Sequence, residues 1–188
     1  MEKNIAKFLY EMSHMRHVKH EGWRMIGVEH VESIAEHSLC AAQIAFVLAT
    51  MEKHPDPCRV CAMVVFHDMA ETRVGDIHKV ANRYVTADEE RAAQEQMEPL
   101  GEMGRDILSL WTETENRSTE AGIIAKDADL LDMALMAKKY TEEGRHFAQD
   151  WIKNVSNALR TESAKSLLKA LQETHSNDWW QGLKKLGK

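Results

Sequence analysis

Helical periodicity is the strongest constraint that this sequence places on its fold. The alternating runs of β-branched residues that strands need are missing. The 188 residues include only 9 glycines and 3 prolines, so few positions can interrupt a helix. No linker or repeat divides the chain. We therefore predict an all-α fold in which residues 1–188 form a single helical bundle.

Start signals divide this pattern into separate helices. Ser33 and Glu36 have the spacing of a capping box, which predicts a helix over residues 34–51. Asp56 followed by Pro57 predicts a second helix, which we expect to continue to Thr72. Further helices are predicted over residues 86–101 and 105–115, from Ser118 or Thr119 to residue 143, and over residues 147–159 and 163–174.

Composition excludes several classes of protein. The net charge of −6 argues against a protein that coats a nucleic acid polymer or an anionic membrane, since both need clustered basic charge. The longest apolar run, residues 44–49, is too short to cross a bilayer, and the N-terminus does not resemble a signal peptide. Two of the 3 cysteines form one isolated CxxC, and we expect all of them to be ordinary helix residues of a cytoplasmic protein.

Helical spacing turns several metal-ligand residue types toward the core. His37 shares a helix face with Ala41 and Leu48, and His67 shares one with Val64. Asp68 follows on the neighbouring face of the same predicted helix. Each of these residues has a simpler alternative, because a single buried histidine is more often a hydrogen-bonded core residue than a ligand.

The predicted helix over residues 119–143 carries the third group of candidate ligands. Asp127, Asp129 and Asp132 compete for the inward position, and periodicity alone does not choose among them. Asp129 could instead be a buried partner of Lys126 or Arg73. If one aspartate joins the two histidines and Asp68, a divalent cation would remove the cost of burying unpaired charge. Two imidazoles and two carboxylates suit a first-row divalent metal.

The order of these residues along the chain, H…HD…D, resembles the metal signature of the HD-domain phosphohydrolases. The surrounding stretches "ESIAEHSL" at 32–39, "HDMAETRVGDI" at 67–77 and "KDADLLDMAL" at 126–135 are similar to the 5′-deoxynucleotidase branch of that family. The resemblance covers about residues 20–140, with "GW" at 22–23 and "GV" at 27–28. It implies a single HD domain, with C-terminal helices of about residues 147–188 packing on the motif-bearing core.

The resemblance also implies roles for individual residues. It favours Asp129 over Asp127, so that the metal ligands would be His37, His67, Asp68 and Asp129. Only His78 lies between the HD pair and the last aspartate, which favours one divalent metal ion: Mn, Co, Fe, Ni, Zn or Mg. Glu71 corresponds to the acid that acts on the attacking water or the leaving group, Asp76 to a sugar contact, and Trp23 to an aromatic beside the nucleoside.

One departure from the family concerns the phosphate. Relatives carry an arginine just before the Gly-Trp pair, whereas this chain has His20 and Glu21 there. The nearby substrate-binding candidates are Lys19, His20 and Arg24, with Arg16 further away. Lysine or histidine would act as a point charge without the two-pronged geometry of arginine.

The resemblance implies a metal-dependent phosphomonoesterase that removes the 5′-phosphate from (deoxy)nucleoside monophosphates by attack of a metal-bound water. It also implies a homodimer. A second reading is an HD-domain phosphohydrolase that acts on a cyclic nucleotide, a dinucleotide or a nucleoside triphosphate. A third is a non-catalytic nucleotide-binding module, although such a module would be expected to lose ligands that are all present here.

Overall fold

The computed structural model describes residues 1–183 and confirms the all-α prediction. Within that range the only β-type pairing is an isolated bridge between Lys19 and Ser33. The α-helices are α1 (Glu2–Ser13), α2 (Ile34–Met51), α3 (Pro57–Val65), α4 (Glu71–Val74), α5 (Glu89–Met97), α6 (Glu102–Asn116), α7 (Glu120–Glu142), α8 (Gln149–Ala158) and α9 (Glu162–Glu173). Short 3₁₀ turns join them: η1 (His14–Arg16), η2 (Glu21–Ile26), η3 (Ala81–Arg83), η4 (Glu98–Leu100) and η5 (His146–Ala148). The last five residues of the predicted C-terminal region, 184–188, lie outside the described range.

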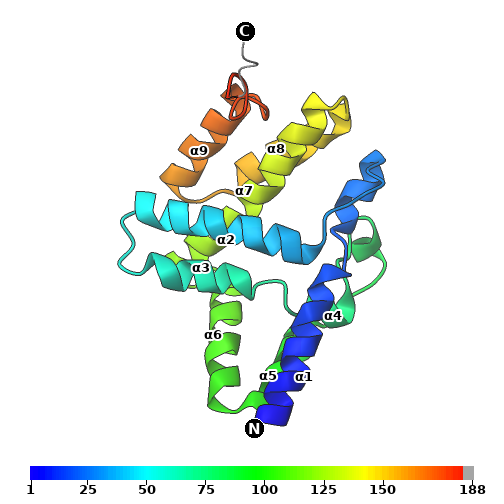
Figure 1. The fold of residues 1–188 in the computed structure, drawn as a ribbon, viewed down its shortest axis with the longest axis vertical. Coiled ribbons are helices and arrows are strands. Elements are labelled where there is room, and N and C mark those ends of the chain that lie inside the picture. The colour runs from blue at the N-terminus through cyan, green and yellow to red at the C-terminus, as the bar shows by residue number, and fades with distance from the viewer. Residues whose placement is uncertain (184–188) are drawn as a thin grey trace.

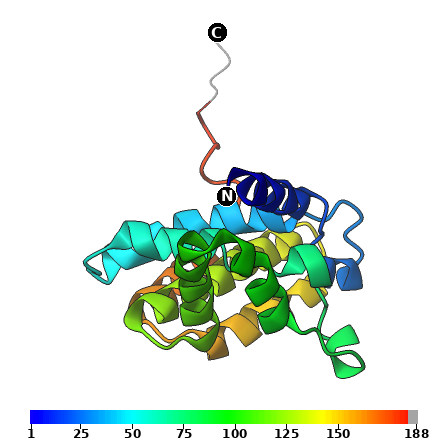
Figure 2. The ribbon, with the colours of Figure 1, turned by 90° about the horizontal axis from the view of Figure 1, so that it is seen from below.

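The long helix α7 is the centre of the bundle. It packs against α2, α3, α6, α8 and α9. In Figure 1, α2 and α3 lie side by side across the middle of the molecule, with α1, α5 and α6 toward the N-terminal end and α8 and α9 toward the other end. Figure 2 shows the same bundle from the end that carries α1, α5 and α6. Helix α2, which carries His37, and helix α3, which leads into His67 and Asp68, therefore both border α7.

Helix α2 begins where the capping box predicts. Ser33 Oγ accepts a hydrogen bond from the Glu36 amide at 3.3 Å, and Glu36 Oε2 accepts one from the Ser33 amide at 2.7 Å. The helix is long and apolar enough, by length and composition alone, to cross a membrane. One side of it is buried in the bundle through Ala41, Ala45 and Leu48, so the same composition serves the core of this domain.

Helix α3 ends at Val65, seven residues before the predicted end at Thr72. The reason is local competition for a carbonyl group. His67 Nδ1 donates to the Val64 carbonyl at 2.7 Å, and the following amides bond three residues back rather than four. His67 and Asp68 therefore lie in a turn between α3 and α4, not on one continuous helix as expected.

Helix α5 is also shorter than the predicted 86–101. Asp88 rather than Thr86 caps its start, because Asp88 Oδ1 accepts from the Arg91 amide at 3.1 Å. The α-helix ends at Met97 and gives way to η4, where Pro99 lacks the N–H that would continue it.

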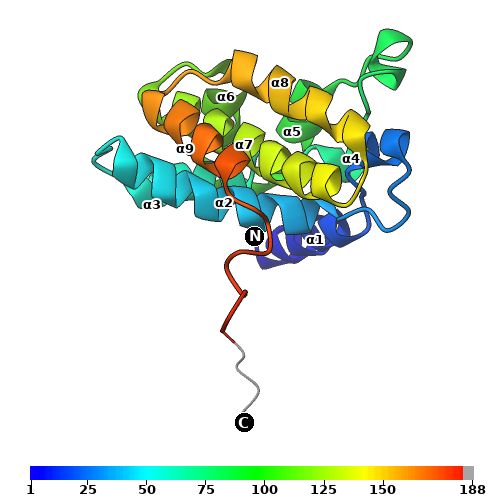
Figure 3. The ribbon, with the colours of Figure 1, turned by 90° about the horizontal axis from the view of Figure 1, so that it is seen from above.

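The C-terminal helices are attached to α7 by a buried carboxylate. Asp127 accepts hydrogen bonds from the amides of Arg160 and Thr161 and from the Thr161 hydroxyl, at 2.7–3.1 Å. Thr161 in turn caps α9. Figure 3 shows α8 and α9 lying over α7 on the side of the molecule that carries this contact.

Candidate metal centre

Three segments bring the four predicted metal ligands together. His37 comes from the first turn of α2, His67 and Asp68 from the turn after α3, and Asp129 from the middle of α7. His37 Nε2 lies 3.1 Å from Asp129 Oδ1 and 3.7 Å from Asp68 Oδ2. His67 Nε2 lies 3.2 Å from Asp68 Oδ2 and 3.6 Å from Asp129 Oδ1. Two nitrogen and two oxygen atoms thus converge on one point.

The ring of His37 is fixed from behind by Asp132. Its Nδ1 lies 2.7 Å from Asp132 Oδ2, and both side chains are about 2% exposed. This hydrogen bond places the proton on Nδ1 and directs Nε2 toward Asp68 and Asp129. Burial would lower the pKa of His37, but the hydrogen bonds with Asp129 and Asp132 outweigh it and raise the pKa well above its usual value.

The ring of His67 provides the test of whether a metal fits. Its Nδ1 donates to the Val64 carbonyl, so in the neutral ring Nε2 carries the lone pair that a metal would need. Nε2 is buried and has no hydrogen-bond partner among the described residues. A buried polar atom without a partner is costly, and a cation held by His67, Asp68, His37 and Asp129 would satisfy it. Mixed imidazole and carboxylate donors suit a first-row divalent metal, and so the residues present fit such an ion.

The three aspartates of α7 are all buried, and each has a different task. Asp127 holds the C-terminal helices, Asp132 orients His37, and Asp129 faces the other ligands. Lys126 Nζ lies 2.9 Å from Asp129 Oδ2. Burial would raise the pKa of Asp129, but Lys126 and the two histidines hold it well below the usual value. Asp129 is therefore both the inward acid and a partner of Lys126.

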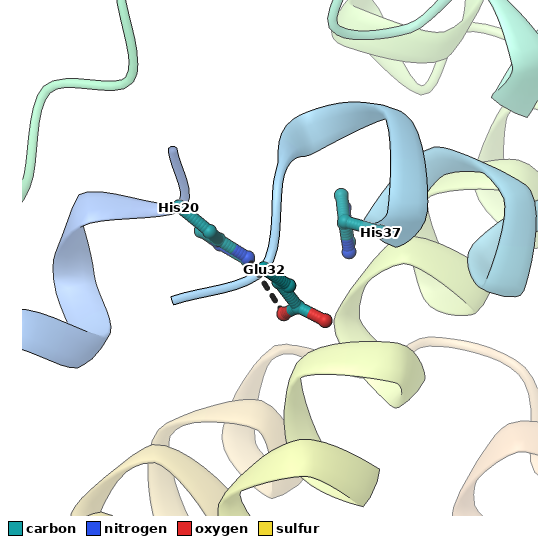
Figure 4. A group of neighbouring side chains, drawn as sticks. All are labelled: His20, Glu32 and His37. Carbon is teal, nitrogen blue, oxygen red and sulfur yellow. Dashed lines mark hydrogen bonds and ion pairs between the residues drawn. The ribbon is translucent and has the colours of Figure 1, made fainter. Parts of the chain in front are cut away.

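A second group borders the first through His37. His20 Nδ1 lies 3.2 Å from Glu32 Oε1, as Figure 4 shows, and its ring centre is 4.8 Å from that of His37. Ligand atoms of His20, Glu32 and His37 lie within 4.8 Å of one another. Both nitrogens of His37 already face aspartates, and Glu32 also accepts from the Trp23 indole at 3.2 Å. This group is thus a hydrogen-bonded wall beside the metal centre.

A cavity of about 480 Å³ opens beside two of the predicted ligands. His67 and Asp68 line it together with Glu71 and Asp76. Gly75, at φ +75°, ends α4 and turns the chain so that Asp76 Oδ2 accepts from the Glu21 amide at 2.5 Å. Burial, and then the charges of Asp68 and Asp76, raise the pKa of Glu71 to about 10. Without metal, Glu71 is therefore protonated at neutral pH.

The predicted substrate-binding residues separate in the structure. His20 lines the cavity, whereas Lys19, Trp23 and Arg24 are not among the residues that line it. Trp23 is about 1% exposed and packs on Tyr140 and Trp151, and Arg24 pairs with Glu21 at 2.6 Å. The substrate-binding role of these three residues stays a prediction, and Trp23 would act on a ligand only through the residues it supports.

Other residues of the cavity were not assigned a site role from the sequence. Lys126 could have been found, because it precedes Asp129 by three residues and so shares its helix face. Lys79 lies in a loop without a pattern, and the part of α8 that reaches the cavity is set by tertiary packing. These residues are Lys79, Glu89, Glu115, Lys126, Asp150, Trp151 and Asn154.

Comparison with known proteins agrees with this geometry. A family model described as "HD domain" matches residues 12–172. The 5′-deoxynucleotidase HDDC2 of Dictyostelium discoideum is 30% identical over 150 residues, which cover 74% of this chain and 79% of that protein.

Solved structures share the fold. A protein from Pyrococcus horikoshii is 25% identical with a TM-score of 0.74, covering 89% of this chain and 98% of its own. A cyanophage S-2L HD phosphohydrolase, solved with dA and one catalytic Zn²⁺ ion, has a TM-score of 0.53 at 17% identity. The alignment covers 88% of this chain and 96% of the phage protein.

Proposed function

Because this chain belongs to the HD-domain family, we propose that it is a metal-dependent phosphomonoesterase that removes the 5′-phosphate from deoxynucleoside monophosphates. The observation that carries the proposal is the unpartnered Nε2 of His67, which faces two carboxylates at the base of a cavity of about 480 Å³. Cavities of roughly 300–1,000 Å³ hold small-molecule ligands. The relatives named 5′-deoxynucleotidase supply the reaction class.

His37, His67, Asp68 and Asp129 would hold the metal. A divalent ion bound there would lower the pKa of a bound water and place a positive charge beside the phosphoryl group. Asp132 keeps His37 in the tautomer that binding needs. The identity of the ion belongs to the proposal too, and we favour a single first-row divalent ion or Mg.

Lys126 is placed to hold the phosphate. The charge of Asp129 raises the pKa of Lys126, so it stays protonated, and its side chain lines the cavity beside Asp129 and Glu115. Most other ionisable side chains of the cavity wall are acids, which would repel a dianionic phosphate. A buried lysine next to the metal ligands offsets that repulsion, as the arginine of relatives would have done.

Glu71 and Asp76 act on the leaving nucleoside. Water attacks phosphorus as the bond to the 5′-oxygen breaks. Glu71, whose pKa burial raises in the metal-free protein, would give a proton to that oxygen and take one back from the attacking water, so that the phosphate leaves with a single proton. Asp76 is held by the Glu21 amide and can accept a hydrogen bond from the sugar hydroxyl. The products are nucleoside and inorganic phosphate.

The test is product analysis with matched substrates. The enzyme, loaded with Mn, Co or Mg, should release phosphate from a 2′-deoxynucleoside 5′-monophosphate and leave the 3′-monophosphate intact. Release of pyrophosphate from a triphosphate, or opening of a cyclic nucleotide in preference to the monophosphate, would move the assignment to the second reading. A protein that binds nucleotide and metal without turnover would support the third.

We also propose that the protein is a cytoplasmic homodimer. The outer face of α2 exposes Leu39, Phe46 and Val47 by 45–61%, an apolar surface that a second copy would cover. The cysteines Cys40, Cys58 and Cys61 are unpaired, as in a reducing compartment. Light scattering of the wild type and of Phe46→Glu tests the dimer. The carboxylate that the substitution introduces should dissociate it into monomers. Cell fractionation tests the proposed cytoplasmic location. We expect neither a membrane nor a nucleic acid polymer as a partner.

A further inference from the structure

The cavity has a second polar wall, built by a helix to which the ligand motifs assign no role. Asp150, Trp151 and Asn154 of α8 line the same cavity as His67 and Asp68. Asp150 and Asn154 are four residues apart, so both project from one face of α8. A ligand whose phosphate lies at the metal centre therefore has a carboxylate and an amide available at another part of the same cavity.

Aromatic packing fixes the position of this wall. The ring centres of Trp151 and Trp23 are 5.3 Å apart, with an angle of 32° between the rings. Trp23 is itself anchored by its hydrogen bond to Glu32. Gly22 lines the same cavity as Trp151, and a Cβ added to it would lie 4.0 Å from Trp151 Nε1, an ordinary van der Waals distance.

Apolar side chains beside this wall suit a flat aromatic ligand. Met25 and Met133 line the cavity together with Trp151. Thioether and indole groups make favourable contacts with aromatic rings. A nucleobase that contacts these side chains would lie in the cavity that Asp150 and Asn154 also line.

The polar pair distinguishes among the bases. An ionised aspartate only accepts hydrogen bonds, through two oxygens, while an asparagine can also donate. Guanine presents a carbonyl oxygen followed by two adjacent N–H donors, which matches an amide donor and a two-oxygen acceptor in order. Adenine and cytosine present one amino donor beside a bare ring nitrogen, and thymine places its single N–H between two carbonyls. Each of those three would set a lone pair against the Asp150 carboxylate.

We infer that the α8 face formed by Asp150 and Asn154 is a nucleobase subsite that selects guanine, which makes 2′-deoxyguanosine 5′-monophosphate the preferred substrate. The inference rests on the proposed nucleotidase function. Asp150 would accept from the guanine N1 and 2-amino groups, and Asn154 would donate to its carbonyl oxygen. Selection then comes from hydrogen bonds that a competing base leaves unmade.

The experiment compares deoxyguanosine and deoxyinosine monophosphates, which differ only in the 2-amino group. With metal-loaded wild type, kcat/KM should be about tenfold higher for the guanine nucleotide, the value expected for one hydrogen bond to a charged acceptor. Asp150→Asn should remove most of that difference, and kcat/KM for the thymine nucleotide should not fall, because the substitution removes the negative charge that faces a thymine carbonyl. Asn154→Ala should lower kcat/KM for both the guanine and the inosine nucleotides.

Two matched controls use residues outside the cavity. Asp106→Asn removes an exposed carboxylate from α6. Asn157→Ala removes an amide of α8 that does not line the cavity but lines a neighbouring hollow, which Asp150 also borders. Both should keep the wild-type ratio. Equal kcat/KM for the two nucleotides in wild type, or an equal loss on every base in Asp150→Asn, would overturn the inference.

Binding of the product nucleosides separates this inference from the proposed function. Deoxyguanosine and deoxyinosine can be titrated into the metal-loaded protein by calorimetry, with no turnover needed. Tighter binding of deoxyguanosine that Asp150→Asn removes supports the subsite, even if no monophosphate is hydrolysed and the proposed function fails. Equal binding of both nucleosides overturns the subsite, even if hydrolysis is observed.

Discussion

Asp132 Oδ2 lies 2.7 Å from Nδ1 of His37, on the side of the ring opposite Asp129. A single turn of α7 therefore carries one acid that faces the candidate metal centre and another that orients His37, the predicted ligand across from it. The arrangement fixes the orientation of the His37 ring before any metal arrives.

Asp132→Asn should weaken metal binding while leaving the fold intact. The amide oxygen can still accept from His37, but the negative charge that strengthens the ligand is lost. Changes of this kind lower metal affinity by about 10- to 100-fold. Calorimetric titration of the chelator-treated protein with Mn or Co measures this affinity. An unchanged affinity would mean that Asp132 plays no part in holding the metal.

Asp127→Ala is the matched contrast on the same helix. It removes the acceptor of the Arg160 and Thr161 amides, so these groups lose a charged partner and α9 loses its anchor. We expect the free energy of unfolding to fall by about 2–3 kcal/mol. Urea unfolding gives this value, and the metal affinity of the folded protein should stay at the wild-type level. Loss of metal binding without loss of stability would contradict the assignment.

Glu71 gives the metal-free protein a pH-dependent stability. Its pKa is about 10 in the folded state and 4.5 for an ordinary glutamate in water, so between those values the folded state holds the extra proton. The free energy of unfolding should therefore fall as the pH rises through this window, since the contribution is fully present below about 4.5. In Glu71→Gln this slope should be smaller.

Urea unfolding of chelator-treated wild type and Glu71→Gln, from pH 5 to pH 9, tests the relation. The variant should also lose about 10²- to 10⁴-fold in kcat, because the amide has no proton to give. Parallel pH profiles for the two proteins would show that Glu71 does not titrate abnormally.

Lys126→Met should lower kcat/KM by about a hundredfold, through loss of a positive charge beside the reacting phosphate. Inhibition by inorganic phosphate should weaken in parallel. The control is Lys138→Met on the same helix, where the lysine pairs with Glu142 at 2.9 Å. Wild-type kcat/KM in Lys126→Met, with metal content preserved, would exclude a role in binding phosphate.

Local signals predict the beginnings of these helices better than their ends. The capping box at Ser33 gave the start of α2, and Asp56 with Pro57 gave the start of α3. The end of α3 depends on a hydrogen bond from the His67 ring to the Val64 carbonyl. Hydrophobic periodicity gives no information about such a side-chain contact. The same ring then leaves Nε2 free for a ligand role, so the error in the helix boundary falls at the candidate site.

The candidate site, too, was predictable from local sequence only in part. Spacing brought His37, His67 and Asp68 inward but could not rank Asp127, Asp129 and Asp132, because all three are buried and differ only in their partners. The resemblance to HD-domain proteins favoured Asp129, the one that faces both histidines. The wall formed by α8 depends on how that helix docks on α7, a long-range contact that local sequence does not encode.

The most direct test of the account is metal-dependent hydrolysis before and after removal of one ligand. Wild type and Asp68→Ala are stripped with chelator, checked by elemental analysis and titrated with Mn in the presence of a 2′-deoxynucleoside 5′-monophosphate. The account predicts that stripped wild type releases no phosphate, that metal restores release, and that Asp68→Ala stays inactive throughout. Undiminished release by metal-free wild type, or full activity in Asp68→Ala, would contradict it.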